Sequence, residues 1–300
     1  MNTLKITSLS LVITSFFVLG CTDDHCDCEN EIYVHIPDSH FETMLIEQGI
    51  DSDGIVNQKI AKSEAIEVTH LDLNLSANYG KVVDLTGISG FENLSHLSVY
   101  GQKIKQLDLS GNTLLDTLYF SNNYITSLDL SKNTNLVFVD MQSNSLTSVT
   151  GLENAMGLKD LDLSWNYFEE FSVNNPTLEV LHMRNNDLKE LDISGAINLK
   201  HILLTSNLLP TLDVSSNTKI ETLLIADNKL EHINFEFNSQ LTHLYIFDNV
   251  LESLDLSAND NLTNLIADRN PDLTCIKIAS GQEIPVLTLS DYQELNEFCN

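Results

Sequence analysis

Between residues 94 and 270 the chain repeats one pattern of apolar and polar positions. In the copy from Leu115 to Asn123, apolar residues hold the first, fourth and sixth positions and asparagine holds the ninth. The intervening residues are polar or variable, so each segment alternates as a strand with one buried face does. The closing amide residues are 21 apart, except for one step of 22 and one of 20 around Asn166. The pattern predicts one short parallel strand per repeat.

A strand with three buried side chains cannot form a core alone, but stacked repeats join those side chains into one column. Nine strands about 4.8 Å apart give a sheet roughly 40 Å wide. Each closing asparagine turns the chain out of the strand while buried, and its amide pairs with backbone groups left open there. We therefore assign a structural role to this asparagine ladder. Its members are Asn123, Asn144, Asn166, Asn186, Asn207, Asn228, Asn249 and Asn270.

The second half of most repeats reads Leu-Asp-Leu, as at residues 128–130, and is often followed by Ser-x-Asn. It is too short for a long helix, so we expect extended or turn-like structure on both sides of each coil. The whole pattern, LxxLxLxxN followed by LDLSxN, resembles the leucine-rich repeats of bacterial surface proteins, of the internalin-like and flavobacterial type. The resemblance covers about 200 of the 300 residues.

That resemblance implies an α/β-type repeat that is mostly β. It implies a right-handed leucine-rich-repeat solenoid with a parallel concave sheet, about 9–10 repeats of about 21 residues and a short N-terminal helical cap. Repeat families share an architecture and not a partner, so the ligand does not follow from it.

Residues 1–20 have the composition of a secretion signal. One cation, Lys5, precedes an apolar run to Leu19 that is too short to span a membrane comfortably. The run ends Val-Leu-Gly before Cys21, which resembles a bacterial lipobox and implies that Cys21 carries a lipid such as palmitate. The alternative is an ordinary cleaved signal with an incidental cysteine.

Acidic residues follow at Asp23 and Asp24 and resemble the surface-export signal of Bacteroidetes lipoproteins; a solvated linker is the alternative. The resemblance implies a Gram-negative outer membrane, with the chain exposed at the cell surface and held by its lipid only. Residues 21–36 then form a tether. His25, Cys26 and Cys28 lie in it, and we interpret them as linker residues because no fourth metal ligand accompanies them.

Residues 37–67 are expected to cap the first coil. Phe41, Met44 and Leu45 have helical spacing, Ser39 and Glu42 form a capping-box pattern, and a glycine follows as a stop signal. The sequence predicts a short amphipathic helix here.

The segment from Asp51 to Glu64 resembles the calcium-loop-like segment that precedes the repeats in this family. Counting twelve residues from Asp53 to Glu64 puts Ile55 at the third position and Gln58 where the sharp-turn glycine belongs. Two requirements of a calcium loop are therefore missing. We expect a capping turn, with a bound cation as the alternative, and assign neither metal nor cofactor to the chain.

The repeats occupy residues 68–274, beginning with an irregular strand, and residues 275–300 form a C-terminal cap. In an oxidising compartment, Cys275 and Cys299 are the predicted disulfide. Closing a loop of about 25 residues contributes on the order of 3 kcal/mol. Cys26 and Cys28 are too close for an unstrained bridge.

The net charge and the absence of catalytic motifs exclude several classes of function. Asp and Glu number 43 against 15 Lys and Arg, which gives a net charge of −28. Such a surface repels nucleic acid and acidic polymers, so we predict no nucleic-acid partner. The sequence has no nucleophile elbow, phosphate loop, HExxH or Cys-x-x-Cys motif, and its nine histidines are scattered. We predict that the protein is not an enzyme.

The informative positions are those that leave each strand on the concave side. The central one of the three concave positions on each strand forms a row across the sheet, here called the middle lane. This lane is polar or acidic through Asp162 and apolar from Leu203 onward. Contiguous exposed apolar surface with a polar rim is typical of a protein-binding site. The predicted site consists of His182, Arg184, His201, Leu203, Leu224, His243, Tyr245, Phe247 and Ile266.

Other interpretations remain open at this point. Tyr100, Tyr119, Trp165 and Tyr245 are candidate platforms for a glycan, and a glycan site would centre on the Tyr119 end beside the acidic lane. The apolar lane is also compatible with a structural or adhesive envelope protein, or with a C-terminal segment that folds back over it. A metal cluster of Asp162, His182 and His201 on neighbouring strands is a further, weaker alternative.

Overall fold

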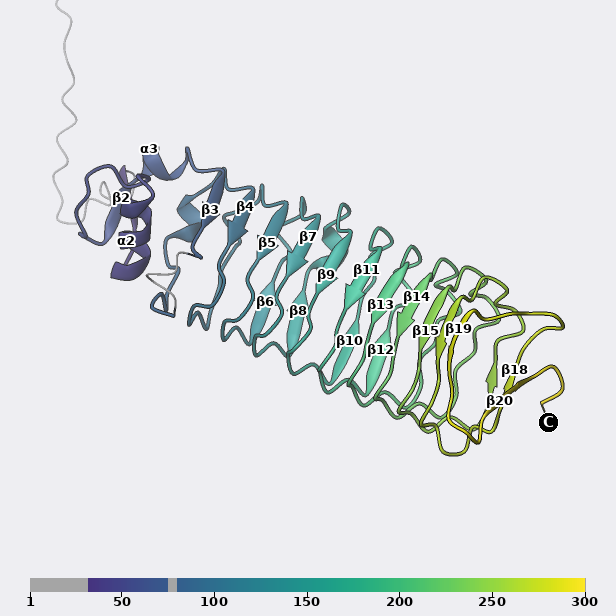
Figure 1. Ribbon diagram of the computed structural model, residues 1–300. Coiled ribbons are helices and arrows are strands. Elements are labelled where there is room, and N and C mark those ends of the chain that lie inside the picture. The colour runs from purple at the N-terminus through teal and green to yellow at the C-terminus, as the bar shows by residue number, and fades with distance from the viewer. Residues whose placement is uncertain (1–31, 75–79, 300) are drawn as a thin grey trace, which may run out of the picture.

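Each repeat contributes one strand to a parallel sheet of 11 strands that runs along the molecule (Figure 1). The computed structural model describes residues 32–74 and 80–299. In spatial order the strands are β3 (His70–Asp72), β4 (His96–Ser98), β5 (Thr117–Tyr119), β7 (Phe138–Asp140), β9 (Asp160–Asp162), β11 (Val180–His182), β13 (His201–Leu203), β14 (Thr222–Leu224), β15 (His243–Tyr245), β17 (Asn264–Ile266) and β19 (Val286–Thr288).

The register of the sheet follows the repeat. Leu118 in β5 lies opposite Val139 in β7, and the next strand continues the row with Leu161. All three side chains are fully buried. The residues on either side of them point to the concave face, so the period-two pattern of the sequence is the pattern of core and surface. The predicted leucine-rich-repeat solenoid is confirmed.

The return limb of each coil is extended or turn-like, as expected from its length. It forms three small parallel sheets and two short 3-10 turns, η2 and η3. The first sheet pairs β6 (Ser127–Asp129) with β8 (Ser148–Thr150), and the second pairs β10 (Glu170–Ser172) with β12 (Glu190–Asp192). The third contains β16 (Leu254–Asp255), β18 (Cys275–Lys277) and β20 (Glu294–Asn296). The 3-10 turns are η2 (Ile88–Gly90) and η3 (Leu152–Asn154).

The asparagine ladder makes the bonds that its sequence predicts. Asn207 is 5% exposed, and its Nδ2 donates to the carbonyls of Met183 and Leu204, each at 2.9 Å. Its Oδ1 accepts the N–H of Leu188 at 3.1 Å. One amide therefore links two coils and closes its own turn.

A second amide ladder, which the sequence analysis missed, runs through the return limb. Asn217 is fully buried, and its Nδ2 donates to the carbonyls of Ile193 (3.0 Å) and Ala196 (2.9 Å) in the preceding coil. Its Oδ1 has no hydrogen-bond partner among the described residues. The other members are Asn112, Asn133, Asn175, Asn238 and Asn259. The asparagine of Ser-x-Asn is thus a buried link between coils.

The N-terminal cap consists of β1 (Tyr33–His35) paired antiparallel with β2 (Lys59–Ala61), and of helices α2 (Ser39–Glu47) and α3 (Lys62–Ala65). The predicted boundary between tether and cap at residue 37 is therefore wrong, because the β1–β2 pairing and the fully buried Ile36 bring residues 33–36 into the cap. The predicted helix is confirmed, and Gly49 after it has φ +71°. The capping box is wrong, because Asp38 and not Ser39 is the N-cap. Glu42 is fully buried and accepts backbone N–H groups of residues 57–59 instead.

Asp38 joins this cap to the array. One carboxylate oxygen accepts the N–H groups of His40 (2.8 Å) and Phe41 (3.2 Å), and the other accepts those of Val83 (2.7 Å) and Asp84 (3.1 Å). A residue that caps a helix therefore also fixes the first loop of the repeats.

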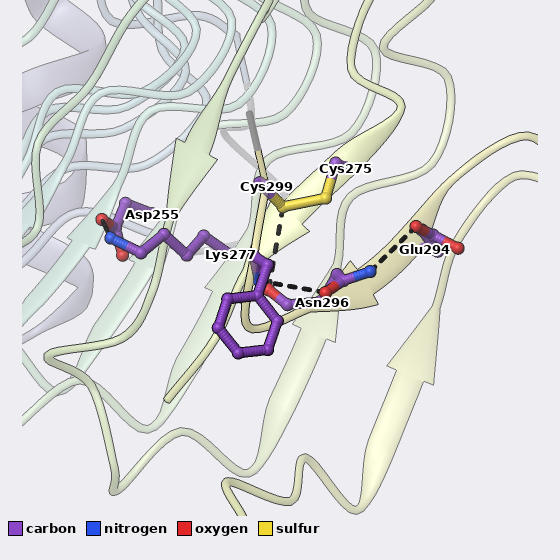
Figure 2. The surroundings of a disulfide bond; sticks show 7 residues. Asp255, Cys275, Lys277, Glu294, Asn296 and Cys299 are labelled. Carbon is purple, nitrogen blue, oxygen red and sulfur yellow. Dashed lines mark hydrogen bonds and ion pairs between the residues drawn. A yellow bond between two sulfur atoms is a disulfide. The ribbon is translucent and has the colours of Figure 1, made fainter. Parts of the chain in front are cut away.

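The C-terminal segment forms a further coil. Cys275 in β18 is bonded to Cys299, as predicted, with Cα atoms 5.7 Å apart. Figure 2 shows this bond beside the ion pair between Lys277 and Asp255 (2.8 Å). The strand β19 within this segment, which the sequence analysis did not predict, pairs with β17.

The predicted signal, Cys21 and the tether cysteines lie outside the described residues. Within residues 32–74 and 80–299, no helix is both long enough and apolar enough to cross a membrane.

Candidate binding surface

The strand register shows where the residues of the predicted apolar lane lie. The strand register places Leu203 opposite Leu224, Leu224 opposite Tyr245, and Tyr245 opposite Ile266. These side chains are half-buried by their neighbours on the sheet. The core residues on either side of Leu203, at 202 and 204, are fully buried. The apolar lane is therefore additional to the core, and the fold does not need it for its interior.

Phe247 lies two residues after Tyr245, just past the end of β15, and an arginine lies over its ring. The guanidinium of Arg269 lies 4.9 Å from the Phe247 ring centre. Arg269 also donates to both carboxylate oxygens of Asp248, at 2.7 and 2.8 Å, and contacts Asp268. In the lane itself, the hydroxyl of Tyr245 accepts a bond from the Asn264 amide at 3.2 Å. Both aromatic rings are thus oriented before any partner arrives.

On β11, the predicted rim residue His182 is less accessible to a partner than its sequence position suggests. Nδ1 of His182 lies 3.3 Å from a carboxylate oxygen of Asp162 on the neighbouring strand. Burial raises the pKa of Asp162, but hydrogen bonds from His182 and Ser164 outweigh it and hold that pKa below its usual range. His182 therefore belongs to the acidic half of the face, while Arg184 is exposed beside it.

The acidic half contains three carboxylates on two adjacent strands. Asp140 accepts bonds from Ser121 (2.6 Å) and from the backbone and side chain of Gln142 (3.1 and 3.2 Å). Asp160 lies on β9 next to Asp162. Burial raises the pKa of Asp160, and the charges of Asp162 and Asp140 raise it further, against the opposing effect of a nearby histidine.

A row of aromatic rings, missed in the sequence, leads into these carboxylates. His70 stacks on His96 at 5.6 Å, His96 lies 5.5 Å from Tyr119, and Tyr119 lies 4.6 Å from Phe138. The register gives the signal that would have found it, because His70, His96 and Phe138 occupy one lane.

The candidate glycan platforms do not come together. Tyr119 on β5 and Tyr245 on β15 are separated by five strands of the sheet. Trp165 is 56% exposed and precedes Asn166 with φ +58°, beyond the end of β9. Tyr119 contacts His96 and Phe138 in the row of aromatic rings.

The described part of the C-terminal segment, through residue 299, does not fold back over the apolar lane. It adds β19 to the edge of the sheet, with Val286 opposite Asn264 and Thr288 opposite Ile266. The apolar lane therefore ends at Thr288, while Val286 in the neighbouring lane is 52% exposed.

The described residues contain neither a metal site nor a deep cavity in the concave lane. No group of three or more His, Cys, Asp or Glu side chains in residues 32–74 and 80–299 is arranged to hold a metal ion, and this includes the suggested cluster around His182. A hollow of about 530 Å³ lies on the return limb, between β8 and β12, and is lined by Phe171 and Leu191. It lies away from the concave lane.

Comparison with solved structures agrees with this architecture. The structure is similar to that of a leucine-rich-repeat protein of Leptospira interrogans, with 24% identity, a TM-score of 0.59, and coverage of 70% of this chain and 64% of that one. It is also similar to YopM of Yersinia enterocolitica (21% identity, TM-score 0.52, 68% and 47% covered) and to a chain of the Drosophila Toll–Spatzle complex (22%, 0.53, 64% and 28%). The chain has the leucine-rich-repeat fold.

No protein-family model and no curated protein sequence matches the chain. The alignments span less than two thirds of each of the three solved structures named above. At these sequence identities, the structural similarity shows that the chain shares the fold of these proteins. Its function has to be inferred from the surface residues of this chain.

Proposed function

We propose that this protein is a non-enzymatic binding module that recognises a protein partner through the apolar half of its concave sheet. The observation behind the proposal is the lane from Leu203 to Ile266, which is apolar although the core is complete without it. The described C-terminal segment extends the sheet beside this lane and leaves its face open. Apolar surface with preoriented aromatic rings favours a protein ligand.

The proposed partner contacts Tyr245 and Phe247 chiefly, with Leu203, Leu224 and Ile266 filling the surface between them. Aromatic anchors in such patches commonly cost about 2 kcal/mol or more on truncation, roughly a thirtyfold loss of affinity. The acidic half, around Asp140, acts mainly on the rate of association and its salt dependence.

The test is affinity capture from the native outer surface, followed by affinity measurement with the captured partner. A Tyr245→Ala, Phe247→Ala double variant should lose binding roughly thirtyfold. A matched control removes two aromatic side chains outside the concave sheet, Tyr124 (51% exposed) and Tyr167 (57% exposed), and should bind normally. Equal melting temperatures establish that each variant is folded. Unchanged binding by the first double variant would reject the apolar lane as the site.

Glycan binding is the second candidate, supported by the row of aromatic rings, because the register places Tyr119 opposite Asp140 and Phe138 opposite Asp160. Rings beside carboxylates suit a sugar, which stacks by its apolar face and donates through its hydroxyls. An Asp140→Asn, Asp162→Asn variant distinguishes the two. If it abolishes capture while the Tyr245 and Phe247 variant does not, the ligand is a glycan at the Tyr119 end.

We also propose that the module is displayed on the outer surface of a Gram-negative cell by a lipid on Cys21. The support is the resemblance of the N-terminal sequence to a lipobox followed by acidic residues. An alkyne fatty acid should label the wild type and leave Cys21→Ser unlabelled, and external protease should digest the protein on intact cells. Equal labelling of the variant would reject the anchor.

A further inference from the structure

The hollow of about 530 Å³ on the return limb crosses four successive coils of the solenoid. Its floor is the two-stranded sheet of β10 and β12, and residues 147–149 and 211–213 of the flanking coils form its two ends. Figure 1 shows β8, β10 and β12 in succession along this side of the molecule. Ligand clefts have volumes of about 300–1,000 Å³, so this hollow, here called the return-limb groove, is large enough to hold a ligand.

The repeat spacing accounts for the groove. Asn166 and Asn186 are 20 residues apart, so the coil that contains β10 is one residue shorter than most, and its return limb projects less far from the core. Within the described residues, β10 and β12 pair with each other and with no strand of the coils on either side. Thr211, in the coil after β12, forms its bridge with His232 instead. The return limb is therefore interrupted on both sides of this short sheet.

Apolar side chains line the floor of the groove and remain partly open. Phe171 on β10 lies opposite Leu191 on β12, and Val149 and Leu212 follow in the flanking coils. Leu191 is half-buried. Val149 is also half-buried, whereas Leu128, opposite it on β6, is only 4% exposed. The groove therefore offers apolar surface that the core does not use.

Four carboxylates line the groove beside this floor. Glu170 lies opposite Glu190 in the register of β10 and β12, while Asp192 and Asp213 occupy the same position in successive coils. All four side chains are exposed, and none forms an ion pair with a described residue. Lys189 also lines the groove, but it is paired at 2.6 Å with a glutamate outside it. The groove thus carries an uncompensated negative charge.

An apolar floor beside carboxylates suits a cation with an aliphatic stem. Arginine and lysine lay their methylene stems on apolar surface while the charged head reaches a polar group, and the arginine head matches the geometry of a carboxylate. In an extended chain, alternate residues point to the same side, about 6.6 Å apart. A segment with basic residues at alternate positions therefore presents several heads to the carboxylates of adjacent coils.

We propose that the return-limb groove binds an extended, arginine- or lysine-rich segment of a protein partner. The basic heads pair with the four carboxylates, and the stems cover Val149 and Leu191. Nucleic acid and a second copy of this chain are both repelled, because the chain has a net charge of −28. The groove is separate from the concave lane, so the two surfaces bind their ligands independently.

The test is fluorescence anisotropy with the purified full chain and two fluorescein-labelled octapeptides. One peptide alternates arginine with serine, which places every arginine on one side of an extended chain. The other alternates glutamate with serine. The arginine peptide should bind and the glutamate peptide should not. Failure of the arginine peptide to bind at concentrations up to about 1 mM, or equal binding of the glutamate peptide, would overturn the proposal.

Two matched double variants separate the groove from the overall negative charge. Asp192→Asn with Asp213→Asn should weaken binding of the arginine peptide about tenfold. Asp108→Asn with Asp129→Asn neutralises two exposed carboxylates at the same position of coils outside the groove and should bind as wild type does. Equal weakening by both double variants would overturn a site in the groove.

These substitutions should leave the fold intact. Each of the four carboxylates accepts the N–H of the serine two residues later, at 2.9 Å. Asn234 occupies the same position in another coil, and its Oδ1 accepts an equivalent bond at 2.9 Å. Asparagine therefore preserves the turn and removes only the charge. Melting temperatures equal to that of wild type check this point.

A third variant, Ser172→Trp, tests whether the peptide lies in the groove itself. Ser172 is exposed on β10 and lines the groove, so an indole there fills the space without entering the core, and strands accommodate tryptophan well. This variant should melt as wild type does and lose most of its binding to the arginine peptide. The Tyr245→Ala, Phe247→Ala variant of the concave lane should bind that peptide normally. Unchanged binding by Ser172→Trp, or lost binding by the concave variant, would contradict the proposed site.

Discussion

The two ends of the solenoid are closed in different ways. At the N-terminal end, Phe41, Met44 and Leu45 of α2 are fully buried, and the Phe41 ring lies 6.3 Å from that of Phe91 in the first coils. At the C-terminal end, the core residue Leu287 of the last sheet strand is 41% exposed. One end is covered by a helix, whereas the other is tied by a disulfide.

The difference shows two solutions to one physical problem. A stack of coils leaves an apolar cross-section at each end, and an end without a cap frays. The N-terminal cap covers its end and fixes itself by buried carboxylates, Asp38 and Glu42. The C-terminal coil covers its end incompletely, so its stability depends on the constraint that the Cys275–Cys299 bond places on the unfolded chain.

The largest expected effect is at the disulfide. A Cys275→Ser, Cys299→Ser variant should lose about 3.5 kcal/mol of unfolding free energy, because the closed loop contains about 25 residues. Denaturant unfolding measures the loss. Hydrogen exchange should become faster in β18 and β20 while β5 keeps its protection, since the last coil frays first.

Intact-mass measurement after alkylation without reductant is the control for this prediction. It should show Cys275 and Cys299 unlabelled in wild type. A double variant with an unchanged unfolding midpoint would mean that packing alone holds the last coil, and the contrast between the two ends would disappear.

The second effect is at Asp38, whose carboxylate accepts four backbone N–H groups from the helix and the first loop. Asp38→Ala should lower the unfolding free energy by about 2 kcal/mol, because it removes a helix cap and leaves buried donors without partners. Ser39→Ala is the matched control, since that side chain is exposed and adjacent. Equal stability of the two variants would show that the cap is held by apolar contacts alone.

The repeats were predictable because their signal is periodic. Eight asparagines in one register and an alternating apolar pattern determine strand, core face and ladder together, and Asn207 makes the bonds expected of it. The apolar concave lane followed from the same register. The disulfide followed from the number and position of the cysteines.

Features set by tertiary contacts were not predictable. Glu42 has the spacing of a capping box, but its partners are 15 to 17 residues later in the chain. Asn217 follows a serine, and the sequence around it is typical of a surface turn. In the structure, however, the preceding coil buries the Asn217 side chain. The strand β19 was missed because its repeat ends in Gln293 and lacks the asparagine.

The smallest effect is expected at the two ends of the asparagine ladder, where Gln102 and Gln293 occupy the position that asparagine holds in the other repeats. Gln102 donates to the Leu73 carbonyl at 3.1 Å and accepts the N–H groups of Lys81 and Val82. Gln293 donates to the Ala267 carbonyl at 3.0 Å and accepts one N–H group, from residue 290. Both side chains are buried, at 3% and 8% exposure.

Shortening either glutamine to asparagine should pull its amide away from these partners. Gln102→Asn should cost about 1–2 kcal/mol, since it loses three bonds in a sealed end, and Gln293→Asn should cost about 1 kcal/mol or less, since it loses two in an end that water reaches. Denaturant unfolding of both variants beside wild type measures the difference. A larger loss at Gln293 than at Gln102 would mean that the C-terminal coil, although less covered, depends more on its amide than the helical cap does.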